Sequence, residues 1–227
     1  MAGKSGRTIS ATPDKSLKKA LLSWEGMLLV LFIAINILCK CISPVYNITN
    51  VLREMPKYLT EIFLLFPMAY ILLMGEIDIS VGSTVCLAAT IACLSSNAGV
   101  PFIGVLLIGL LTGTVCGMIN GFLATRFREL PTMIITLGTQ IVFRGIAEIA
   151  LGDGGSVSLT NADGFRAIAG KVGPIPYMFF IVIICAVIFT VIAEKRVFGR
   201  NLYAIGSNSK TAFYSGIKVN QMLFISY

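Results

Sequence analysis

The sequence contains no histidine, and none of its six cysteines forms a Cys-x-x-Cys pair. Structural zinc sites draw their ligands from cysteine and histidine at such spacings, so we expect no metal site. We interpret the cysteines as small apolar packing residues. The sequence also lacks the Gly-x-x-x-x-Gly-Lys-Ser/Thr loop that cradles nucleotide phosphates. We therefore expect that the chain does not hydrolyse a nucleotide and binds no cofactor itself.

Charged residues are scarce, at 13% of the chain, whereas hydrophobic residues make up 56% and the mean hydropathy is +0.86. A helix that crosses a bilayer takes roughly 20 mostly apolar residues. The composition predicts an all-α fold, a polytopic integral membrane helical bundle with about six spans. The expected spans are residues 21–40, 58–75, 79–97, 101–124, 132–151 and 174–193. Residues 222–227 indicate the start of a seventh span, so we expect that the chain is truncated or is a fragment.

The 18 Lys and Arg residues predict the orientation, because short cytoplasmic loops collect positive charge. With the N-terminus inside, twelve of them lie in the cytoplasmic segments 1–20, 125–131 and 194–221, and five lie outside. We expect a basic cytoplasmic tail over residues 1–20 and a transmembrane domain over residues 21–227. This topology accounts for the net charge of +7, so we expect no nucleic-acid partner.

The loop at about 194–221 has more internal pattern than a simple tether needs. It carries five Lys or Arg residues against one acid, Glu194. Gly199, Gly206 and Gly216 predict positions where short helices end or the chain turns sharply. A basic and ordered cytoplasmic loop indicates a docking surface for a partner inside the cell.

Glycines recur at every fourth position of the fourth expected span, at Gly109, Gly113, Gly117 and Gly121. This spacing puts them on one side of a helix, where a neighbouring backbone can approach closely. We interpret the stripe as a helix-packing seam, and a hinge or pore lining is the alternative. Asn120 beside it predicts an interhelical hydrogen bond.

Polar residues follow one slowly drifting stripe along the fifth expected span. They are Thr132, Thr136, Thr139, Gln140, Arg144 and Glu148. Arg144 lies about 20 Å along this span at 1.5 Å per residue, where an isolated charge costs at least about 2.5–3.5 kcal/mol. Glu148, one turn later, can pair with it. The stripe is either a structural ion pair inside the bundle or, with Gln140 and Arg144, part of the path of a polar solute.

Two acids lie between the second and third expected spans, in the segment 75–83, Gly-Glu-Ile-Asp-Ile-Ser-Val-Gly-Ser. Asp78 or Ser80 at the start of the next helix can satisfy its unpaired backbone N–H groups and complement its dipole. Hydroxyl-rich solutes are commonly held by carboxylates and amides, so direct contact of Asp78 and Ser80 with a solute is the alternative.

Three separated groups of residues resemble the membrane permease of ribose-type, simple-sugar ABC importers. They are the segments 75–83, 136–138 with 143–145, and 198–208 with 215–217. Their order and spacing match that family over nearly the whole chain after the basic tail. The first group departs from the usual Gly-Gly-Ile-Asp-Leu-Ser pattern, because Glu76 replaces a glycine and adds a charge.

The resemblance implies a binding-protein-dependent importer in the inner membrane of a bacterium. An extracytoplasmic receptor would deliver a monosaccharide, two identical or related permease subunits would form the pathway within the lipid, and cytoplasmic ATPases would use the ATP. Several further spans would follow Tyr227. The loop that contacts the ATPase would include Phe198, Gly199, Arg200, Ala204, Gly206, Asn208, Ser215 and Gly216. Which sugar is carried stays open.

Two rival hypotheses remain from the residues. In an ion-coupled secondary transporter or channel, Glu76, Asp78, Arg144 and Glu148 would form a proton or ion relay. In the second, the chain is a non-functional truncated permease fragment or a membrane scaffold. An ATP-driven permease requires its ATPase, whereas an ion-coupled carrier fails when an uncoupler collapses the ion gradient.

Overall fold

The computed structural model describes residues 23–43, 45–152, 155–159, 163–173 and 175–227. The expected cytoplasmic tail 1–20 therefore lies outside the described residues. The chain divides into two units, Met1–Arg53 and Glu54–Tyr227.

The first unit contains α2 (Trp24–Ile42) and the beginning of α3 (Ile48–Leu73). Ser23 caps α2, because its hydroxyl accepts the Gly26 N–H at 3.1 Å. The Tyr46 hydroxyl donates to the side-chain oxygen of Asn36 and so ties the following turn back to α2. Apolar side chains are exposed all around α2, as expected for a helix whose natural solvent is lipid.

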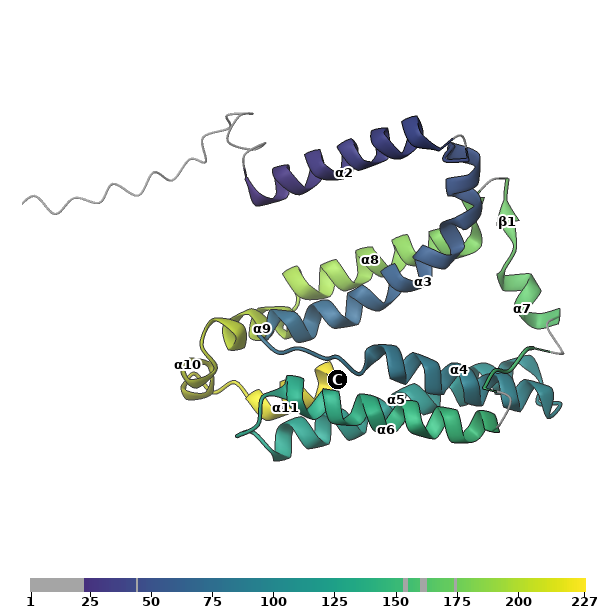
Figure 1. The fold of residues 1–227 in the computed structure, drawn as a ribbon. Helices are drawn as coiled ribbons and strands as arrows, with labels where there is room; N and C mark the ends of the chain where they lie inside the picture. Colours follow the sequence, from purple (N-terminus) through teal and green to yellow (C-terminus); the bar gives the residue numbers. More distant parts are fainter. Residues whose placement is uncertain (1–22, 44, 153–154, 160–162, 174) are drawn as a thin grey trace, which may run out of the picture. The chain divides into compact units, whose positions relative to one another are not determined.

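Three helices of the second unit pack side by side: α4 (Val81–Asn97), α5 (Phe102–Arg126) and α6 (Thr132–Leu151) (Figure 1). Their shared core contains Leu87, Cys116, Phe143 and Ala147. The small residues at its centre let the helices approach closely, as is typical of membrane bundles.

The remainder of α3 packs on α8 (Tyr177–Lys195) through aromatic contacts. The Tyr70 ring stacks on Phe189 at 5.1 Å between centroids, and its hydroxyl donates to the Phe189 carbonyl at 2.9 Å. Between α6 and α8 lie a short helix, α7 (Asp163–Ile168), and a two-stranded antiparallel ribbon of β1 (Lys171–Val172) and β2 (Ile175–Pro176). These are the only strands among the described residues.

The segment after α8 folds into α9 (Val197–Ser207), α10 (Ser209–Tyr214) and α11 (Val219–Ser226). A second core forms where α9 and α11 meet the ends of α3 and α5. Its fully buried side chains include Leu202 and Leu223, with Ala124 and Met74 beside them. Local order in the 194–221 loop is therefore as the sequence predicted.

Each of the six expected spans contains a helix, which confirms a polytopic helical membrane protein. By length and composition, α3, α5, α6 and α8 can each cross a membrane, and α2 and α4 are shorter apolar helices. The main difference concerns α3, which begins at Ile48, ten residues before the expected start. Its first turns carry polar residues, so hydropathy alone placed the boundary too late.

Candidate functional site

The chain between α3 and α4, residues 74–80, is neither helix nor strand, and we call it the unwound segment. Two of its backbone N–H groups are directed at threonine hydroxyls on α6. The Ile79 N–H donates to Thr136 Oγ1 at 3.1 Å, and the Ile77 N–H lies 3.5 Å from Thr132 Oγ1. Non-helical backbone is tolerated in membrane proteins only where its polar groups find partners. The two threonines therefore stabilise the break between the helices.

The spacing of the donors and of the acceptors explains why both contacts can form at once. Ile77 and Ile79 are two residues apart, which is roughly 6.6 Å in an extended chain, and Thr132 and Thr136 are one helical turn apart, roughly 5.4 Å. Thr136 is fully buried and Thr132 is 6% exposed. The first half of the predicted polar stripe on α6 thus faces the unwound segment.

Glu76, the residue that departs from the family pattern, also binds this stripe. The Thr132 hydroxyl donates to Glu76 Oε2 at 2.6 Å. A hydrogen bond to a carboxylate is shorter and stronger than one between neutral groups. The added charge at position 76 therefore has a specific partner on α6.

Asp78 and Ser80 form a small network with α5. Asp78 Oδ1 accepts both the Ser80 N–H at 2.8 Å and the Ser80 hydroxyl at 2.7 Å, and Asn120 Nδ2 donates to Ser80 Oγ at 2.6 Å. Burial raises the pKa of the Asp78 carboxyl, and the two hydrogen bonds from Ser80 oppose that rise. The hydrogen bond predicted for Asn120 is present, but its acceptor lies in the unwound segment and not in another helix.

The capping hypothesis was wrong for Ser80. Ser80 occupies the N-cap position of α4, but its side chain makes no hydrogen bond to the first turn of that helix. Its hydroxyl hydrogen is directed to Asp78 instead, and Asp78 accepts the N–H of Ser80 itself. The hydroxyl thus joins the unwound segment to Asn120 on α5 and does not cap α4.

Two buried side-chain amide oxygens, Asn120 Oδ1 on α5 and Gln140 Oε1 on α6, have no hydrogen-bond partner within the described part of the chain. Asn120 is 2% exposed. A buried acceptor without a donor costs free energy, so each is a point where a water or a solute hydroxyl can bind favourably.

Arg144 and Glu148 form the predicted ion pair, with 3.2 Å between Nε and Oε1. Their side chains are 59% and 65% exposed, so this end of the polar stripe faces outward, whereas the threonines face inward. Arg144 Nη1 also lies 3.5 Å from Cys86 Sγ on α4. No hydrogen bond or ion pair between described residues joins Arg144 to Asp78. The structure therefore brings Asp78 and Ser80 together, and it leaves Arg144 in a separate, open location.

The three glycines of the loop differ in their outcome. Gly206 lies one residue before the end of α9, and Gly216 follows α10 with a left-handed backbone at φ +85°, so the predicted helix end and turn are confirmed at these two positions. The prediction was wrong for Gly199, which lies in the first turn of α9. A side chain at Gly199 would collide with the Ala193 carbonyl, and one at Gly206 would collide with the Leu73 carbonyl. These glycines permit α9 to lie directly against the ends of α8 and α3.

Several other residues of the predicted docking loop also build the fold. Phe198 packs edge-on against Tyr70 at 5.5 Å between centroids. Asn208 caps α10, because its side chain accepts the Thr211 N–H at 3.0 Å, and the Ser215 hydroxyl donates to the Thr211 carbonyl at 3.0 Å.

Most of the predicted docking residues are exposed, and the exposed surface also includes residues that sequence reasoning did not single out. Of the eight predicted residues, Gly199 is buried and Phe198 is half-buried, and the other six are exposed: Arg200, Ala204, Gly206, Asn208, Ser215 and Gly216. In the same loop, Tyr203, Phe213 and Tyr214 are large exposed aromatic residues, with Tyr214 86% exposed. The sequence signal available for these three residues was the presence of aromatic residues in a basic loop.

The glycine stripe of α5 meets two different helices. A side chain at Gly117 would collide with the carbonyl of Tyr227, and one at Gly121 would come within 3.1 Å of Phe224. A side chain at Gly109 would lie 3.6 Å from Ala92 of α4, whereas Gly113 has open space around it. The stripe's role as a packing seam along its whole length stays a prediction.

The model of one protein family, described as the branched-chain amino acid transport system / permease component, matches residues 58–227. Among known proteins, the D-allose transport system permease protein AlsC of Escherichia coli (strain K12) is 32% identical over 236 residues, which cover 99% of this chain and 70% of that protein.

The autoinducer 2 import system permease protein LsrD of Klebsiella pneumoniae subsp. pneumoniae is 29% identical and covers 92% of this chain and 64% of that protein. Its counterpart in Salmonella typhi is 30% identical and covers 90% of this chain and 63% of that protein. The chain thus spans about two thirds of the length of these curated relatives. No solved structure matches the chain.

Proposed function

This chain belongs to the family of the branched-chain amino acid transport system / permease component, and we propose that it serves as a permease subunit of an ATP-driven importer for a monosaccharide or a similar hydroxyl-rich solute. The observation that carries this proposal is the similarity over 90–99% of the chain to proteins named for the transport of D-allose and of autoinducer 2. As a permease, the chain supplies a passage and performs no chemistry on the solute.

The geometry around the unwound segment supports this role. Broken helices whose free backbone groups line a site are typical of membrane transporters. Here Asp78, Ser80 and Gln140 offer carboxylate, hydroxyl and amide oxygens, and Gln140 Oε1 is a buried acceptor to which no described residue donates. Arg144 offers an exposed guanidinium further along α6. These four residues are the proposed contacts with the solute, because sugars bind through several hydroxyl groups that both donate and accept.

The energy for import, in this proposal, comes from ATP that a cytoplasmic partner ATPase hydrolyses. The exposed surface of α9 and α10 is the proposed docking site for that ATPase, with Arg200, Tyr203, Lys210, Phe213 and Tyr214 in contact with it. Aromatic residues and arginine are the types enriched at protein interfaces. The half-buried Phe198, which packs on Tyr70, would hold this surface in shape.

The proposed arrangement has the N-terminus in the cytoplasm and the 194–221 loop on the same side. An extracytoplasmic receptor would deliver the solute to the opposite side, and a second permease subunit, identical or related, would complete the pathway. The excess of Lys and Arg in the segments assigned to the inside supports this orientation.

Uptake measurements in native cells test the function. We expect deletion of the gene to abolish uptake of labelled D-allose or autoinducer 2, and reintroduction to restore it. Brief treatment with an uncoupler that preserves cellular ATP should leave uptake intact, and deletion of the ATPase should abolish it. Uptake that survives loss of the ATPase and collapses with the uncoupler would instead establish an ion-coupled carrier.

Cross-linking tests the docking surface and the orientation. A photoactivatable reagent on Lys210→Cys, in a variant without the other cysteines, should capture an ATPase subunit in native membranes. Lys171→Cys is the matched control, because it has the same charge change and lies in a segment assigned to the outside. An impermeant thiol reagent applied from outside should label only Lys171→Cys. Labelling of Lys210→Cys from outside would contradict both the orientation and the docking site.

A further inference from the structure

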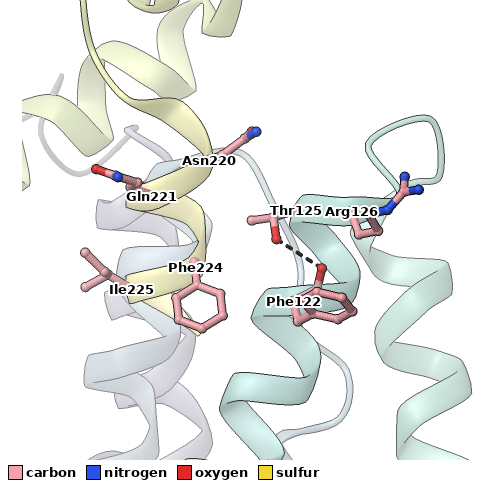
Figure 2. A pocket seen from close by; sticks show the side chains of 7 residues that line it. All are labelled: Phe122, Thr125, Arg126, Asn220, Gln221, Phe224 and Ile225. Atoms are coloured by element: carbon pink, nitrogen blue, oxygen red, sulfur yellow. Dashed lines mark hydrogen bonds between the residues drawn. The ribbon is translucent and has the colours of Figure 1, made fainter.

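A groove lies between the end of α5 and the beginning of α11 (Figure 2). Its volume is about 420 Å³, within the range of roughly 300–1,000 Å³ of small-molecule sites. The lining residues are Phe122, Thr125, Arg126, Asn220, Gln221, Phe224 and Ile225.

One end of the groove is polar and rich in donors. Arg126 lies with its guanidinium carbon 5.7 Å from the centre of the Phe127 ring and forms no ion pair with any described residue. Arg128 donates to Asn220 Oδ1 at 3.0 and 2.8 Å, so this acceptor is occupied and the Asn220 NH₂ remains as a donor. The nearest acid in sequence is the exposed Glu129. The polar end therefore suits an anion.

The other end of the groove is apolar. Phe122 and Phe224 lie one helical turn further into their helices than Arg126 and Asn220, and Figure 2 shows their rings below the polar end. The side chains of Phe122 and Ile225 remain 59% and 65% exposed. Thr125 adds no free donor, because its hydroxyl bonds to carbonyls of its own helix.

The groove is located at the boundary of a membrane span. Arg126 is in the last turn of α5, a helix long and apolar enough to cross a bilayer. Its polar end therefore lies at the level of the lipid head groups, whichever side of the membrane it faces, and its apolar end lies at the level of the acyl chains. Basic pockets between membrane helices at this level bind anionic head groups.

We propose that this groove is a binding site for one anionic phospholipid, with the phosphodiester held by Arg126 and the amide of Asn220 and an acyl chain lying against Phe122 and Phe224. A soluble phosphate would bind at the polar end alone and leave the apolar end of the groove uncovered. A zwitterionic lipid such as phosphatidylcholine carries the same phosphodiester, but its choline cation offsets that charge and weakens its attraction to Arg126. The lipid would contact both α5 and α11. The chain from α11 to Tyr227 approaches α5 closely at Gly117 and Gly121.

Native mass spectrometry of the full chain in detergent, titrated with phosphatidylglycerol or phosphatidylcholine, tests the proposal. Phosphatidylglycerol should bind more tightly, and Arg126→Gln should weaken its binding about fivefold, since one basic residue near a head group contributes about 1 kcal/mol. Arg126→Lys should retain most of the affinity. Lys195→Gln is the matched control, because Lys195 is in the last turn of α8 but outside the groove, and it should bind as the parent does.

A fluorescence experiment reports on the apolar end of the groove in a protein that keeps the charge of Arg126. In a Trp24→Phe background, which removes the one native tryptophan, Phe122→Trp should be quenched by phosphatidylglycerol with brominated acyl chains, and excess glycerol phosphate should leave the quenching unchanged. Equal quenching by brominated phosphatidylcholine, full competition by glycerol phosphate, or equal loss of affinity in Arg126→Gln and Lys195→Gln would each overturn the proposal.

Discussion

Thr136→Val removes the principal anchor of the unwound segment while keeping the shape of the side chain. Thr136 is fully buried, and its hydroxyl accepts the Ile79 N–H at 3.1 Å. Valine has no acceptor, so the substitution leaves the N–H of the half-buried Ile79 without this partner, which costs about 1–3 kcal/mol. We therefore expect the free energy of unfolding to fall by that amount and amide exchange at Ile79 to become about 5–140 times faster, at tenfold per 1.4 kcal/mol.

Thr114→Val provides the matched control. Thr114 is also in a membrane helix, but it is exposed and its hydroxyl donates only to the Leu110 carbonyl of its own helix, at 2.8 Å. Removing that hydroxyl strands no buried donor, so we expect a change within about 0.5 kcal/mol. Both variants are to be compared by reversible unfolding in mixed micelles of rising SDS content, with hydrogen exchange in the folded state. An equal cost in the two variants, with unchanged exchange at Ile79, would refute the anchoring role.

Further substitutions test the docking loop and the polar stripe. Gly206→Ala places a methyl group against the Leu73 carbonyl and should destabilise the fold by about 1–3 kcal/mol in the same unfolding assay, whereas Gly113→Ala, in open space within a helix, should be neutral or stabilise by about 0.5–1 kcal/mol. Asn208→Ala removes the cap of α10 and should cost about 0.5–2 kcal/mol, which Asn208→Ser should largely restore. Arg144→Gln breaks an exposed pair and should change stability by less than about 1 kcal/mol, yet it should lower uptake in cells; a large loss of stability would assign it a structural role instead.

The helices of this fold follow from the sequence because lipid imposes a simple requirement. A span needs a long apolar run, and such runs are visible without knowledge of tertiary contacts. The same reasoning failed at the start of α3, where the helix extends from Ile48 through polar residues that hydropathy does not mark. Sequence reasoning also identified Asn120 as a donor to a group outside its own helix, since a buried amide in a membrane helix must find a partner, but it expected that partner on another helix.

The partners themselves could not be predicted, because they lie far away in the sequence. Asn120 binds Ser80, 40 residues earlier, and Thr136 accepts an N–H from a segment 57 residues earlier. Gly206 shows the same limit in another way. A glycine near a helix end predicts either backbone freedom or a close approach, and only the proximity of the Leu73 carbonyl distinguishes the two.

The polar stripe of α6 serves two purposes along one helix. Its threonines are buried and satisfy the unwound segment, so their polarity has a partner within this chain. Arg144 and Glu148 pair with each other and still leave more than half of each side chain exposed. Exposure to hydrocarbon would cost at least about 2.5–3.5 kcal/mol for the charged group. This face of α6 must therefore meet water or another protein surface in the membrane, and the pathway proposed above, shared with a second permease subunit, would provide both.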